Sequence, residues 1–396
     1  MNSMAVSCPP WLANHLQQVG GVATFRQYMD WSLNDPEHGF YGSGQVRLGP
    51  KGDFVTSPSL GTDFGELLAR QVIAWLQACP ITQRLSIVEI GPGDGDLAAA
   101  LIEQLKQVMP DRLDQLELVL VEHNPAMRQR QQTRLAGETC LAIRWCSLEQ
   151  LRSEPRYAVV LAHELLDALP IDRLICHQQH LQLVGVALRQ DGCLEQVVLP
   201  LPVEMAEEIE AVQQRCGFQL PPAQAPEGWT TEWHSSLLPW YEKLSAAIDQ
   251  GLLLVIDYAL EAHRYYNARR AQGTLMTYSN QQAGCDPLHN IAGQDLTAHL
   301  CIETVNDFAI ASGWQPLASA RQGEVLLALG LAERLYELQS LPAGQLPEAL
   351  RRREALLRLV DPAGLGEFRW LLFGKGDVFK DMSFAMPADI AQSPLR

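Results

Sequence analysis

The middle of the chain alternates between short apolar runs and longer stretches whose apolar residues have helical spacing. Residues 85–90 form an apolar run that ends at glycines, and residues 97–108 have the spacing of an amphipathic helix. Residues 116–121 repeat the apolar run, and Pro125 marks the next helix start. Further apolar runs follow at 141–145, 157–162 and 251–257. Alternating units of this kind predict a parallel sheet covered by helices on both faces.

The flanking segments have other patterns. Residues 17–33 favour a helix interrupted by Gly20 and Gly21, and residues 38–54 form a glycine-rich loop. The remaining expected elements are a helix at 64–76, hairpin-like strands within 174–199, helices at 204–214 and 237–248, a strand at 274–278, helices at 302–312 and 347–360, and an edge strand at 368–373. We therefore predict an α/β fold. It has a doubly wound, mostly parallel, Rossmann-like sheet with an N-terminal helical cap and an α/β insertion.

The changes of pattern divide the chain into four consecutive segments. They are the helical cap and glycine-rich loop at 1–84, the first part of the core at 85–175, an insertion or substrate subdomain at 176–250, and the rest of the sheet with C-terminal helices at 251–396. A length of 396 residues fits two or three such units.

Composition excludes several classes of protein. The formal charge of −16, from 30 Lys and Arg against 46 Asp and Glu, argues against nucleic-acid binding and permits a cationic substrate. The nine cysteines include no CxxC pair, so we expect neither a zinc site nor a thioredoxin-type site, and no metal cofactor. No run of about 18 apolar residues occurs, and the first basic residue is Arg26, so we expect a cytoplasmic chain without a membrane span or targeting peptide.

A glycine-rich turn, IVEIGPGDGDL at residues 87–97, lies where the first strand leads into the first helix. Gly91, Gly93 and Gly95 allow a sharp turn and a close approach of a ligand to the main chain. The alternative is an ordinary tight turn with no ligand. The spacing is also close to the dinucleotide fingerprint, so a nicotinamide oxidoreductase is a competing function.

Acidic residues around this turn favour a cationic ligand. Asp94 and Asp96 would repel a pyrophosphate at the helix N-terminus, and Glu89 precedes the first glycine by two residues. S-adenosylmethionine carries a sulfonium and an ammonium group, so these acids favour it over NAD.

Two later segments complete the predicted nucleoside site. Glu122 ends the second strand, where an acid can accept both ribose hydroxyls. It follows Gly91 by 31 residues, and residues 110–115 can absorb the extra length. Ser147 and Leu148 follow the third strand, where an adenine would lie.

These residues carry a resemblance. The chain resembles class I S-adenosylmethionine-dependent methyltransferases, and more narrowly the MidA-like family of NADH dehydrogenase (complex I) assembly-factor methyltransferases. The matching segments run in family order: GGVATFRQYMDWSLNDPEHGFYGSG (20–44), GDFVTSP (52–58), FGELLA (64–69), VEIGPGDGDL (88–97), HELLDALP (163–170), VIDY (255–258), DPLHNIAGQDLTAHL (286–300) and, more weakly, GLGEFRWLL (364–372). The sequence departs from the family pattern at His163, Ala259 and Met276, where Asn, Gly and Arg are expected.

The resemblance implies arginine methylation of a protein, a subunit of the respiratory NADH dehydrogenase in the best-known member, with S-adenosylhomocysteine as the product. Glu164 and Asp167 follow the strand at 157–162, and carboxylates suit a planar guanidinium, so we predict both as catalytic. The alternative is that both acids stabilise a helix N-terminus. His163 is predicted to contact substrate, either as a base or as a hydrogen-bonding histidine.

Two further predictions concern a loop and the end of a strand. By resemblance the N-terminal part folds over the cofactor cleft, so Thr56, Ser57 and Pro58 are predicted to contact the cofactor; the alternative is a helix cap and turn. Asp257 and Tyr258 end a central strand and are predicted to line the substrate channel, with packing as the alternative.

Two further functions compete with arginine methylation. Methylation of a small molecule or of another residue type is favoured by Met276, and an assembly chaperone without turnover is the other option. A homodimer is one option for the oligomeric state.

Overall fold

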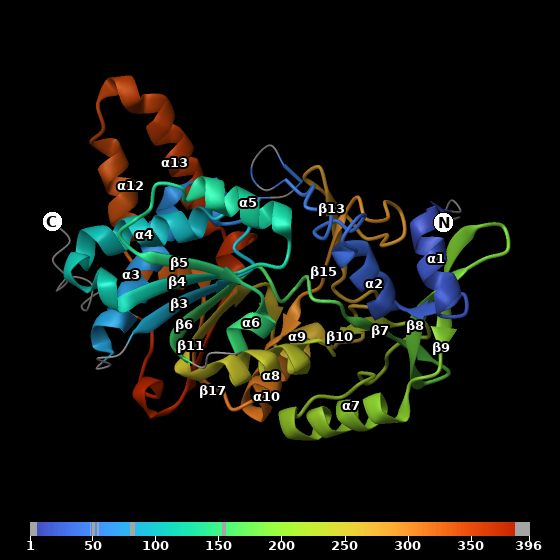
Figure 1. The fold of residues 1–396 in the computed structure, drawn as a ribbon. Coiled ribbons are helices and arrows are strands. Elements are labelled where there is room, and N and C mark those ends of the chain that lie inside the picture. The colour runs from blue at the N-terminus through green and yellow to red at the C-terminus, as the bar shows by residue number, and fades with distance from the viewer. Residues whose placement is uncertain are drawn as a thin grey trace. The chain divides into compact units, whose positions relative to one another are not determined.

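The computed structural model describes residues 6–47, 49, 52–53, 55–79, 84–152 and 156–384 (Figure 1). The chain forms two compact units, each assembled from separate segments. Unit 1 contains Met1–Arg47, Asp167–Trp240 and Ala259–Ala311; unit 2 contains Leu48–Leu166, Tyr241–Tyr258 and Ser312–Arg396. This division differs from the four consecutive segments that we predicted. Strands near the N-terminus pair with strands more than a hundred residues later, and a pattern read along the chain cannot detect such pairing.

Unit 2 is built on a seven-stranded sheet. Its strands, in spatial order, are β17 (Gln315–Arg321), β18 (Arg369–Lys375), β11 (Ile248–Asp257), β6 (Arg156–His163), β3 (Leu85–Ile90), β4 (Leu116–Val121) and β5 (Ala142–Cys146). The last five are parallel, whereas β18 is antiparallel to both of its neighbours. The sheet is therefore mixed, and the strands predicted from the central apolar runs are confirmed.

Helices cover both faces of this sheet, with α4 and α5 above it and α6 and α8 below it in Figure 1. The helices of unit 2 are α3 (Thr62–Ala78), α4 (Asp96–Val108), α5 (Pro125–Arg134), α6 (Leu148–Arg152), α8 (Leu237–Ala247, which begins in unit 1), α11 (Gln322–Ala328), α12 (Leu331–Gln339) and α13 (Leu346–Leu359). Short 3₁₀ turns lie at Pro58–Leu60, Pro110–Gln115, Ala343–Gln345, Leu365–Glu367 and Asp377–Phe379. Because both faces are covered, β3 is buried along its whole length.

The prediction of an edge strand at 368–373 was wrong in its position. This segment forms β18, which pairs with β11 on one side and with β17 on the other. Four consecutive residues, Trp370, Leu371, Leu372 and Phe373, are at most 2% exposed. An uninterrupted apolar run is typical of a strand buried on both faces, and β17, with its exposed first residues, occupies the edge instead.

Unit 1 contains a second sheet, which is antiparallel. Its strands are β1 (Val6–Ser7), β9 (Cys193–Leu199), β8 (His180–Leu188), β7 (Asp172–His177) and β10 (Thr230–Trp233), with β2 (Val22–Thr24) beside β8. Two small sheets join β12 (Ala259–Leu260) to β16 (Leu300–Cys301), and β13 (Met276–Ser279) to β14 (Gln282–Gly284) and β15 (Asp295–Thr297). The helices are α1 (Pro10–Gln18), α2 (Phe25–Asn34), α7 (Val203–Cys216), α9 (Ala262–Tyr265) and α10 (Ile302–Ala311).

The helix predicted at 17–33 is also corrected. Gly20 and Gly21 have φ angles of 86° and 88°, which end α1, and the chain then forms β2 before α2 begins. Thr24 starts α2 with a capping box, in which Thr24 and Gln27 each accept a hydrogen bond from the other's backbone N–H.

The glycine-rich loop at 38–54 has neither helix nor strand in its described part, and positions 48, 50, 51 and 54 lie outside the described residues. Within the described part of the chain, every helix is too short or too polar for a membrane-spanning segment.

Candidate active site in unit 2

The predicted site lies where the strand order of the large sheet reverses. β3 pairs with β4 on one side and with β6 on the other, and all three are parallel, so their carboxyl ends meet at one edge. Ligands of open α/β sheets bind at this point. Gly91, Glu122 and Glu164 directly follow these three strands. All the predicted site residues except Asp167 belong to unit 2.

The turn after β3 depends on three glycines in the left-handed region. Gly91, Gly93 and Gly95 have φ angles of 67°, 53° and 85°. A Cβ added at Gly91 would lie 2.9 Å from Leu165 Cδ1. The positive φ angles favour glycine at all three positions, and Gly91 is exposed at the turn.

Glu89 is a buried carboxylate that lacks a complete set of partners. It lies in β3, is 4% exposed, and its Oε2 has no hydrogen-bond partner among the described residues. Burial, together with the charge of Asp96, raises the pKa of Glu89 to about 8. A buried polar atom without a partner is costly, so it indicates a ligand that supplies a donor or a positive charge.

Asp94 and Asp96 are paired with arginines, contrary to the expectation of two free acids at this turn. Asp94 Oδ1 lies 3.4 Å from Arg130 Nη1, and Asp96 Oδ1 lies 3.1 Å from Arg134 Nε. Both arginines belong to α5 and neutralise the acids that we expected to repel a pyrophosphate. Any preference for a cationic ligand is therefore expected from Glu89, which has no such ion pair in the described part of the chain.

Glu122 is held by its own loop and by a residue that the sequence did not reveal. Its Oε1 accepts the N–H of Asn124 at 2.9 Å, and its Oε2 accepts from Gln131 Nε2 at 3.2 Å. The same amide donates to Gly93 O at 2.8 Å, and Gln131 Oε1 accepts from Trp145 Nε1 at 3.1 Å. Gln131 is fully buried and joins the ends of three strands. Its segment, PAMRQRQQTR, is so polar that nothing marks this glutamine as buried.

The predicted adenine contacts lie at the start of α6. The Ser147 hydroxyl accepts the N–H of Gln150 at 3.2 Å, and the Ser147 N–H donates to Gln150 Oε1 at 2.8 Å. This reciprocal pair caps the helix. Leu148 is 6% exposed. The contacts that the structure gives Ser147 are thus those of a helix cap, and adenine binding stays a prediction.

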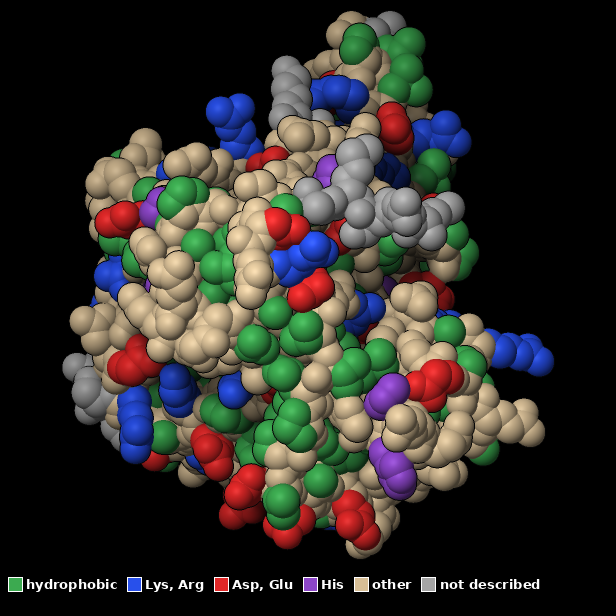
Figure 2. Space-filling view, turned by 90° about the vertical axis from the view of Figure 1, so that its right-hand side faces the viewer, with side chains coloured by type: hydrophobic (Ala, Val, Ile, Leu, Met, Phe, Trp, Pro, Cys, Tyr) green, Lys and Arg blue, Asp and Glu red, His purple; other side chains and the backbone are tan. Residues whose placement is uncertain are grey.

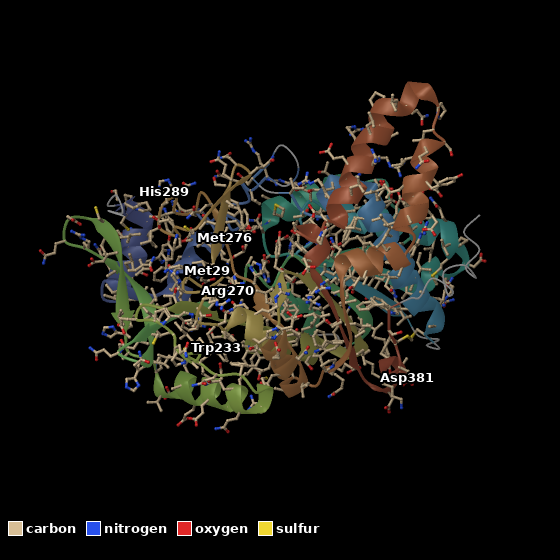
Figure 3. The ribbon with its side chains drawn as sticks, turned by 180° about the vertical axis from the view of Figure 1, so that it is seen from behind. Met29, Trp233, Arg270, Met276, His289 and Asp381 are labelled. Carbon is tan, nitrogen blue, oxygen red and sulfur yellow. The ribbon has the colours of Figure 1, made fainter. Side chains whose placement is uncertain are left out.

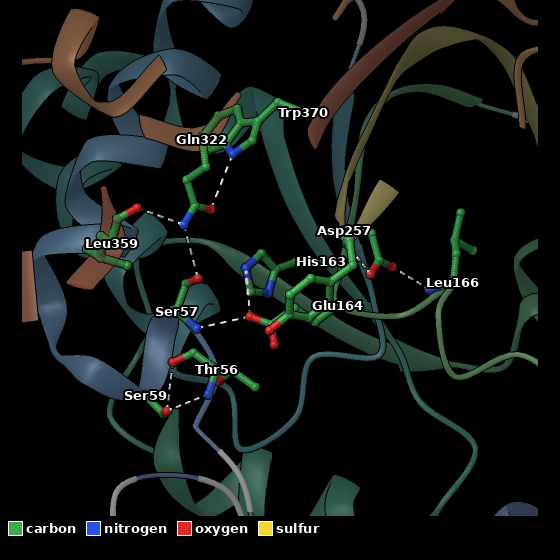
Figure 4. Close-up of polar contacts among 11 residues, drawn as sticks. Thr56, Ser57, Ser59, His163, Glu164, Leu166, Asp257, Gln322, Leu359 and Trp370 are labelled. Atoms are coloured by element: carbon green, nitrogen blue, oxygen red, sulfur yellow. Dashed lines mark hydrogen bonds and ion pairs between the residues drawn. The ribbon is translucent and has the colours of Figure 1, made fainter. Parts of the chain in front are cut away.

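Glu164 has an unusual backbone conformation directly after β6 (Figure 4). Its φ is 47°, a region that residues other than glycine seldom adopt and that recurs at functional sites. The Glu164 N–H donates to Ile256 O at 2.8 Å, and its Oε1 accepts the N–H of Ser57 at 3.0 Å. Strand β11 and the loop before α3 therefore fix both the backbone and the carboxylate.

The neighbouring His163 is neutral. Its Nε2 lies 3.4 Å from Glu164 Oε1, a contact that becomes an ion pair only if the ring is protonated. Burial lowers the pKa of His163 to about 3, so protonation does not occur near neutral pH. The ring packs on Phe64 at a centroid distance of 5.1 Å. These surroundings fit a packed histidine better than a catalytic base.

The loop at Thr56, Ser57 and Pro58 is tied down from two sides. The Thr56 N–H donates to Ser59 Oγ at 3.0 Å, and Pro58 begins a 3₁₀ turn. Ser57 is fully buried, and Gln322 Nε2 lies 3.5 Å from its Oγ. The sequence did not reveal Gln322 as a buried residue, because the start of α11 has the spacing of an ordinary amphipathic helix. Gln322 also donates to Leu359 O at 3.2 Å and accepts from Trp370 Nε1 at 3.3 Å.

Asp257 positions the backbone around Glu164. This carboxylate is 1% exposed; its Oδ2 accepts the N–H of Leu166 at 3.0 Å and its Oδ1 accepts the N–H of Tyr258 at 2.8 Å. The Tyr258 ring packs on Phe368 at 3.9 Å between centroids. Both residues therefore make structural contacts, and a substrate contact stays a prediction.

Asp167 lies in unit 1, separate from the unit that holds Glu164. Asp167 is 6% exposed. The pKa of Tyr278 is raised, first by the burial of its own side chain and then by the negative charges of Asp167 and Asp295. Asp295 Oδ2 accepts from the Tyr41 hydroxyl at 2.7 Å. Met276, at the position where the family pattern has Arg, lies on β13 (Figure 3).

Comparison with known proteins agrees with this geometry. Residues 67–320, about two thirds of the chain, match the model of a family of S-adenosyl-L-methionine-dependent methyltransferases. A Burkholderia thailandensis protein crystallised with S-adenosyl-homocysteine is 26% identical, with a TM-score of 0.79 over 97% of this chain and 94% of that one. A native crystal structure of a COG1565 superfamily protein from Burkholderia thailandensis gives a TM-score of 0.77 over the same shares of the two chains.

Sequence relatives are named protein arginine methyltransferases. The Danio rerio mitochondrial protein arginine methyltransferase NDUFAF7 is 32% identical over 41% of this chain and 42% of its own length. The Drosophila melanogaster homologue is 25% identical over 90% of this chain and 82% of its own length. The chain thus matches less than half of the length of the first of these two relatives.

The residues present fit an S-adenosyl group. The Oε2 of Glu89, which has no partner among the described residues, can accept from an ammonium. Gly91 is exposed at the turn, and Glu122 stands where ribose hydroxyls are bound in related sheets.

Proposed function

Because this chain belongs to the MidA-like family of class I S-adenosylmethionine-dependent methyltransferases, we propose that it methylates an arginine side chain of a protein. The relatives named as protein arginine methyltransferases support this acceptor. A net charge of −16 also favours a cationic substrate. The acceptor protein that we propose is a subunit of the respiratory NADH dehydrogenase, as the resemblance implies.

The observation that carries the proposal is the constrained carboxylate of Glu164. A non-glycine residue at φ 47° is maintained only when the surrounding structure stabilises it, here through Ile256 and Ser57. A carboxylate fixed at the carboxyl edge of the sheet can bind a guanidinium through paired, charge-assisted hydrogen bonds. It would direct one nitrogen toward the methyl donor.

S-adenosylmethionine supplies an electrophilic methyl carbon on its sulfonium. In the proposed arrangement Glu89 binds the ammonium of this cofactor, and Glu122 binds the ribose. Glu164 orients the acceptor nitrogen, and Asp257 holds the backbone that carries Glu164. The chain thus contributes mainly positioning and exclusion of water, which displacement at a sulfonium requires. Asp167 stays a predicted second carboxylate, and its role is not part of this arrangement.

Methyl transfer from labelled S-adenosylmethionine into a lysate of cells lacking the protein tests the proposal. We expect one labelled protein, with the label recovered as methylarginine after hydrolysis. Glu164→Gln should lower the rate by about 100-fold, because a misplaced acceptor reacts slowly, with S-adenosylhomocysteine affinity unchanged. Glu103→Gln, at an exposed acid of α4, is the matched control.

Three outcomes would contradict parts of the proposal. Full activity of Glu164→Gln would remove this carboxylate from the mechanism. Label in another residue type or in a small molecule would replace the arginine acceptor, as the Met276 departure allows. Binding of the cofactor without any transfer would favour an assembly chaperone.

A further inference from the structure

Gln131 is a polar side chain in the interior of unit 2. Polar side chains usually lie at the surface, and in Figure 2 acidic and basic side chains are interspersed over the face that is shown. Gln131 is instead 0% exposed. A buried amide lowers stability unless its N–H groups and its oxygen make hydrogen bonds. The groups that Gln131 binds therefore indicate why a glutamine occupies this position.

Three partners fix the orientation of the Gln131 amide. Its Nε2 carries two hydrogens and lies 2.8 Å from Gly93 O and 3.2 Å from Glu122 Oε2, which are both acceptors. Its Oε1 lies 3.1 Å from Nε1 of Trp145, which can only donate. A flipped amide would place donor against donor and acceptor against acceptor. The amide therefore has one orientation, and Trp145 on β5 helps to fix it.

Helix α5 holds Glu122 at further points. Arg128 Nε donates to Glu122 O at 2.6 Å, and the N–H of Asn124, the N-cap residue of α5, donates to Glu122 Oε1 at 2.9 Å. Each carboxylate oxygen of Glu122 thus accepts one hydrogen bond from the described part of the chain. An ionised carboxylate has about four lone-pair sites, so each oxygen can still accept a ribose hydroxyl.

The same amide joins Glu122 to the glycine-rich turn. Gly93, at φ 53°, is the middle glycine of this turn, and its carbonyl accepts the other N–H of Gln131. The backbone of α5 also packs here, because a Cβ added at Gly95 would lie 3.7 Å from Gln131 Cα. One side chain therefore connects the acid that follows β4 with the turn that follows β3.

We propose that Gln131 is a positioning residue for the ribose of the cofactor. Oriented by Trp145, it holds the Glu122 carboxylate at a set place relative to the glycine turn, and Glu122 then accepts the ribose hydroxyls. Gln131 acts through Glu122, since it is fully buried and both of its N–H groups are engaged. A carboxylate that is held in place before binding loses less conformational entropy when the ligand binds. This inference rests on the ribose role proposed for Glu122 and is independent of the methyl acceptor.

Calorimetric titration with S-adenosylhomocysteine and with its 2′-deoxy analogue tests the proposal, because the ratio of the two affinities reports the hydroxyl contact. The wild type should bind the analogue at least about tenfold more weakly, since a hydrogen bond to a charged group is lost. Gln131→Met keeps the length of the side chain and removes all three hydrogen bonds, so the ratio should fall to about threefold or less. Glu122→Ala should abolish the preference. A general loss of structure would weaken both ligands alike and leave the ratio unchanged.

A second variant leaves Gln131 in place. Trp145→Phe removes the N–H that orients the amide, so the ratio should fall in the same direction, by about twofold. If Gln131→Met does not fold, the ratio measured for Trp145→Phe decides. Gln132→Met, at the exposed next residue of α5, is the matched control and should keep the wild-type ratio.

Two results would overturn the proposal in different ways. If Glu122→Ala abolishes the preference while Gln131→Met and Trp145→Phe keep the wild-type ratio, Gln131 does not position the acid. If the wild type binds the two compounds equally, the ribose role of Glu122 is wrong as well. Neither result bears on the arginine acceptor, which the transfer of labelled methyl groups measures separately.

Discussion

Two glutamates, one in each unit, are almost completely buried and have opposite surroundings. In unit 1 the Glu232 carboxylate, fully buried, accepts hydrogen bonds from Thr274 N and Oγ1 at 2.9 Å each, from the Tyr265 hydroxyl at 3.1 Å and from Leu275 N at 3.2 Å. In unit 2 the Glu89 carboxylate, 4% exposed, has an Oε2 without any partner in the described part of the chain. Burial alone therefore does not show whether the fold satisfies the hydrogen bonds of a carboxylate.

The two carboxylates differ in their hydrogen-bond partners. Glu232 joins three separate segments, and a Cβ at Gly273 would overlap its carboxylate, so the surrounding backbone is shaped to hold it. Its charge also favours the charged form of the buried Arg173. At Glu89, burial and the nearby charge of Asp96 penalise the ionised form and raise the pKa. We infer that the first acid contributes to folding and the second to ligand binding.

The largest expected effect is on stability in unit 1. Glu232→Gln keeps the shape of the side chain but places its amide N–H against the N–H and O–H donors that now bind the carboxylate. It also removes the negative charge near Arg173. We expect the free energy of unfolding to fall by about 3 kcal/mol, because several buried donors lose their charged acceptor. Chemical denaturation measures this loss. The protein that stays folded should bind S-adenosylhomocysteine normally, and a lost affinity would show that the two glutamates do not differ as we infer.

The matching substitution in unit 2 should act on binding instead. Glu89→Gln removes the charge that the ligand ammonium needs, so S-adenosylhomocysteine affinity should fall by about 100-fold, or about 2.7 kcal/mol. The free energy of unfolding should stay constant or rise, since a neutral amide costs less to bury. Calorimetric titration and denaturation of the same sample measure both quantities. Unchanged affinity would exclude Glu89 from the site.

The pH dependence of binding sharpens the contrast. With a pKa of about 8, Glu89 is mostly protonated at pH 7, and a cationic ligand group favours its ionised form. Binding should therefore release a proton, and affinity should fall as the pH drops below about 8, by at most about tenfold per unit. Titration at several pH values measures this slope, and Glu89→Gln should remove it.

The same shift has a consequence for folding. The pKa of Glu89 is raised above its ordinary value of 4.5, so between pH 4.5 and about 8 the unfolded chain releases this proton while the folded chain keeps it. Stability from this group should fall as the pH rises through that window. The stability of the wild type should fall more steeply between pH 4.5 and about 8 than that of Glu89→Gln. Equal slopes would contradict the raised pKa of Glu89.

The smallest effect is expected at the paired acids. Asp94 and Asp96 are partly exposed and bound to Arg130 and Arg134, and exposed ion pairs contribute at most about 1 kcal/mol to stability. Asp94→Asn and Asp96→Asn should each change S-adenosylhomocysteine affinity by less than about threefold. A loss as large as that of Glu89→Gln would restore the electrostatic role that the sequence suggested for them.

Local patterns predicted the central sheet well. The runs at 85–90 and 116–121 form β3 and β4 with the expected bounds, because strands buried on both faces need continuous apolar sequence. The turn at Gly91 was also predictable, since a positive φ strongly favours glycine.

Contacts between distant segments could not be predicted in this way. Gln131 and Gln322 look like polar helix residues, yet both are fully buried and hydrogen-bonded by residues far along the chain. The interior position of β18 and the interleaving of the two units have the same origin, because strand pairing depends on hydrogen bonds that leave no local periodicity.

The sequence by itself determined the parallel strands, the glycine turn and the identity of the acids at the carboxyl ends of β3, β4 and β6. These features follow from local apolar runs and from backbone restrictions on single residues. Only the tertiary structure decided which acids are neutralised. Asp94 and Asp96 meet arginines of α5, Glu232 meets four donors, and one oxygen of Glu89 has no partner within the described ranges. The partners of a charge are set by packing between elements and not by its neighbours in the chain.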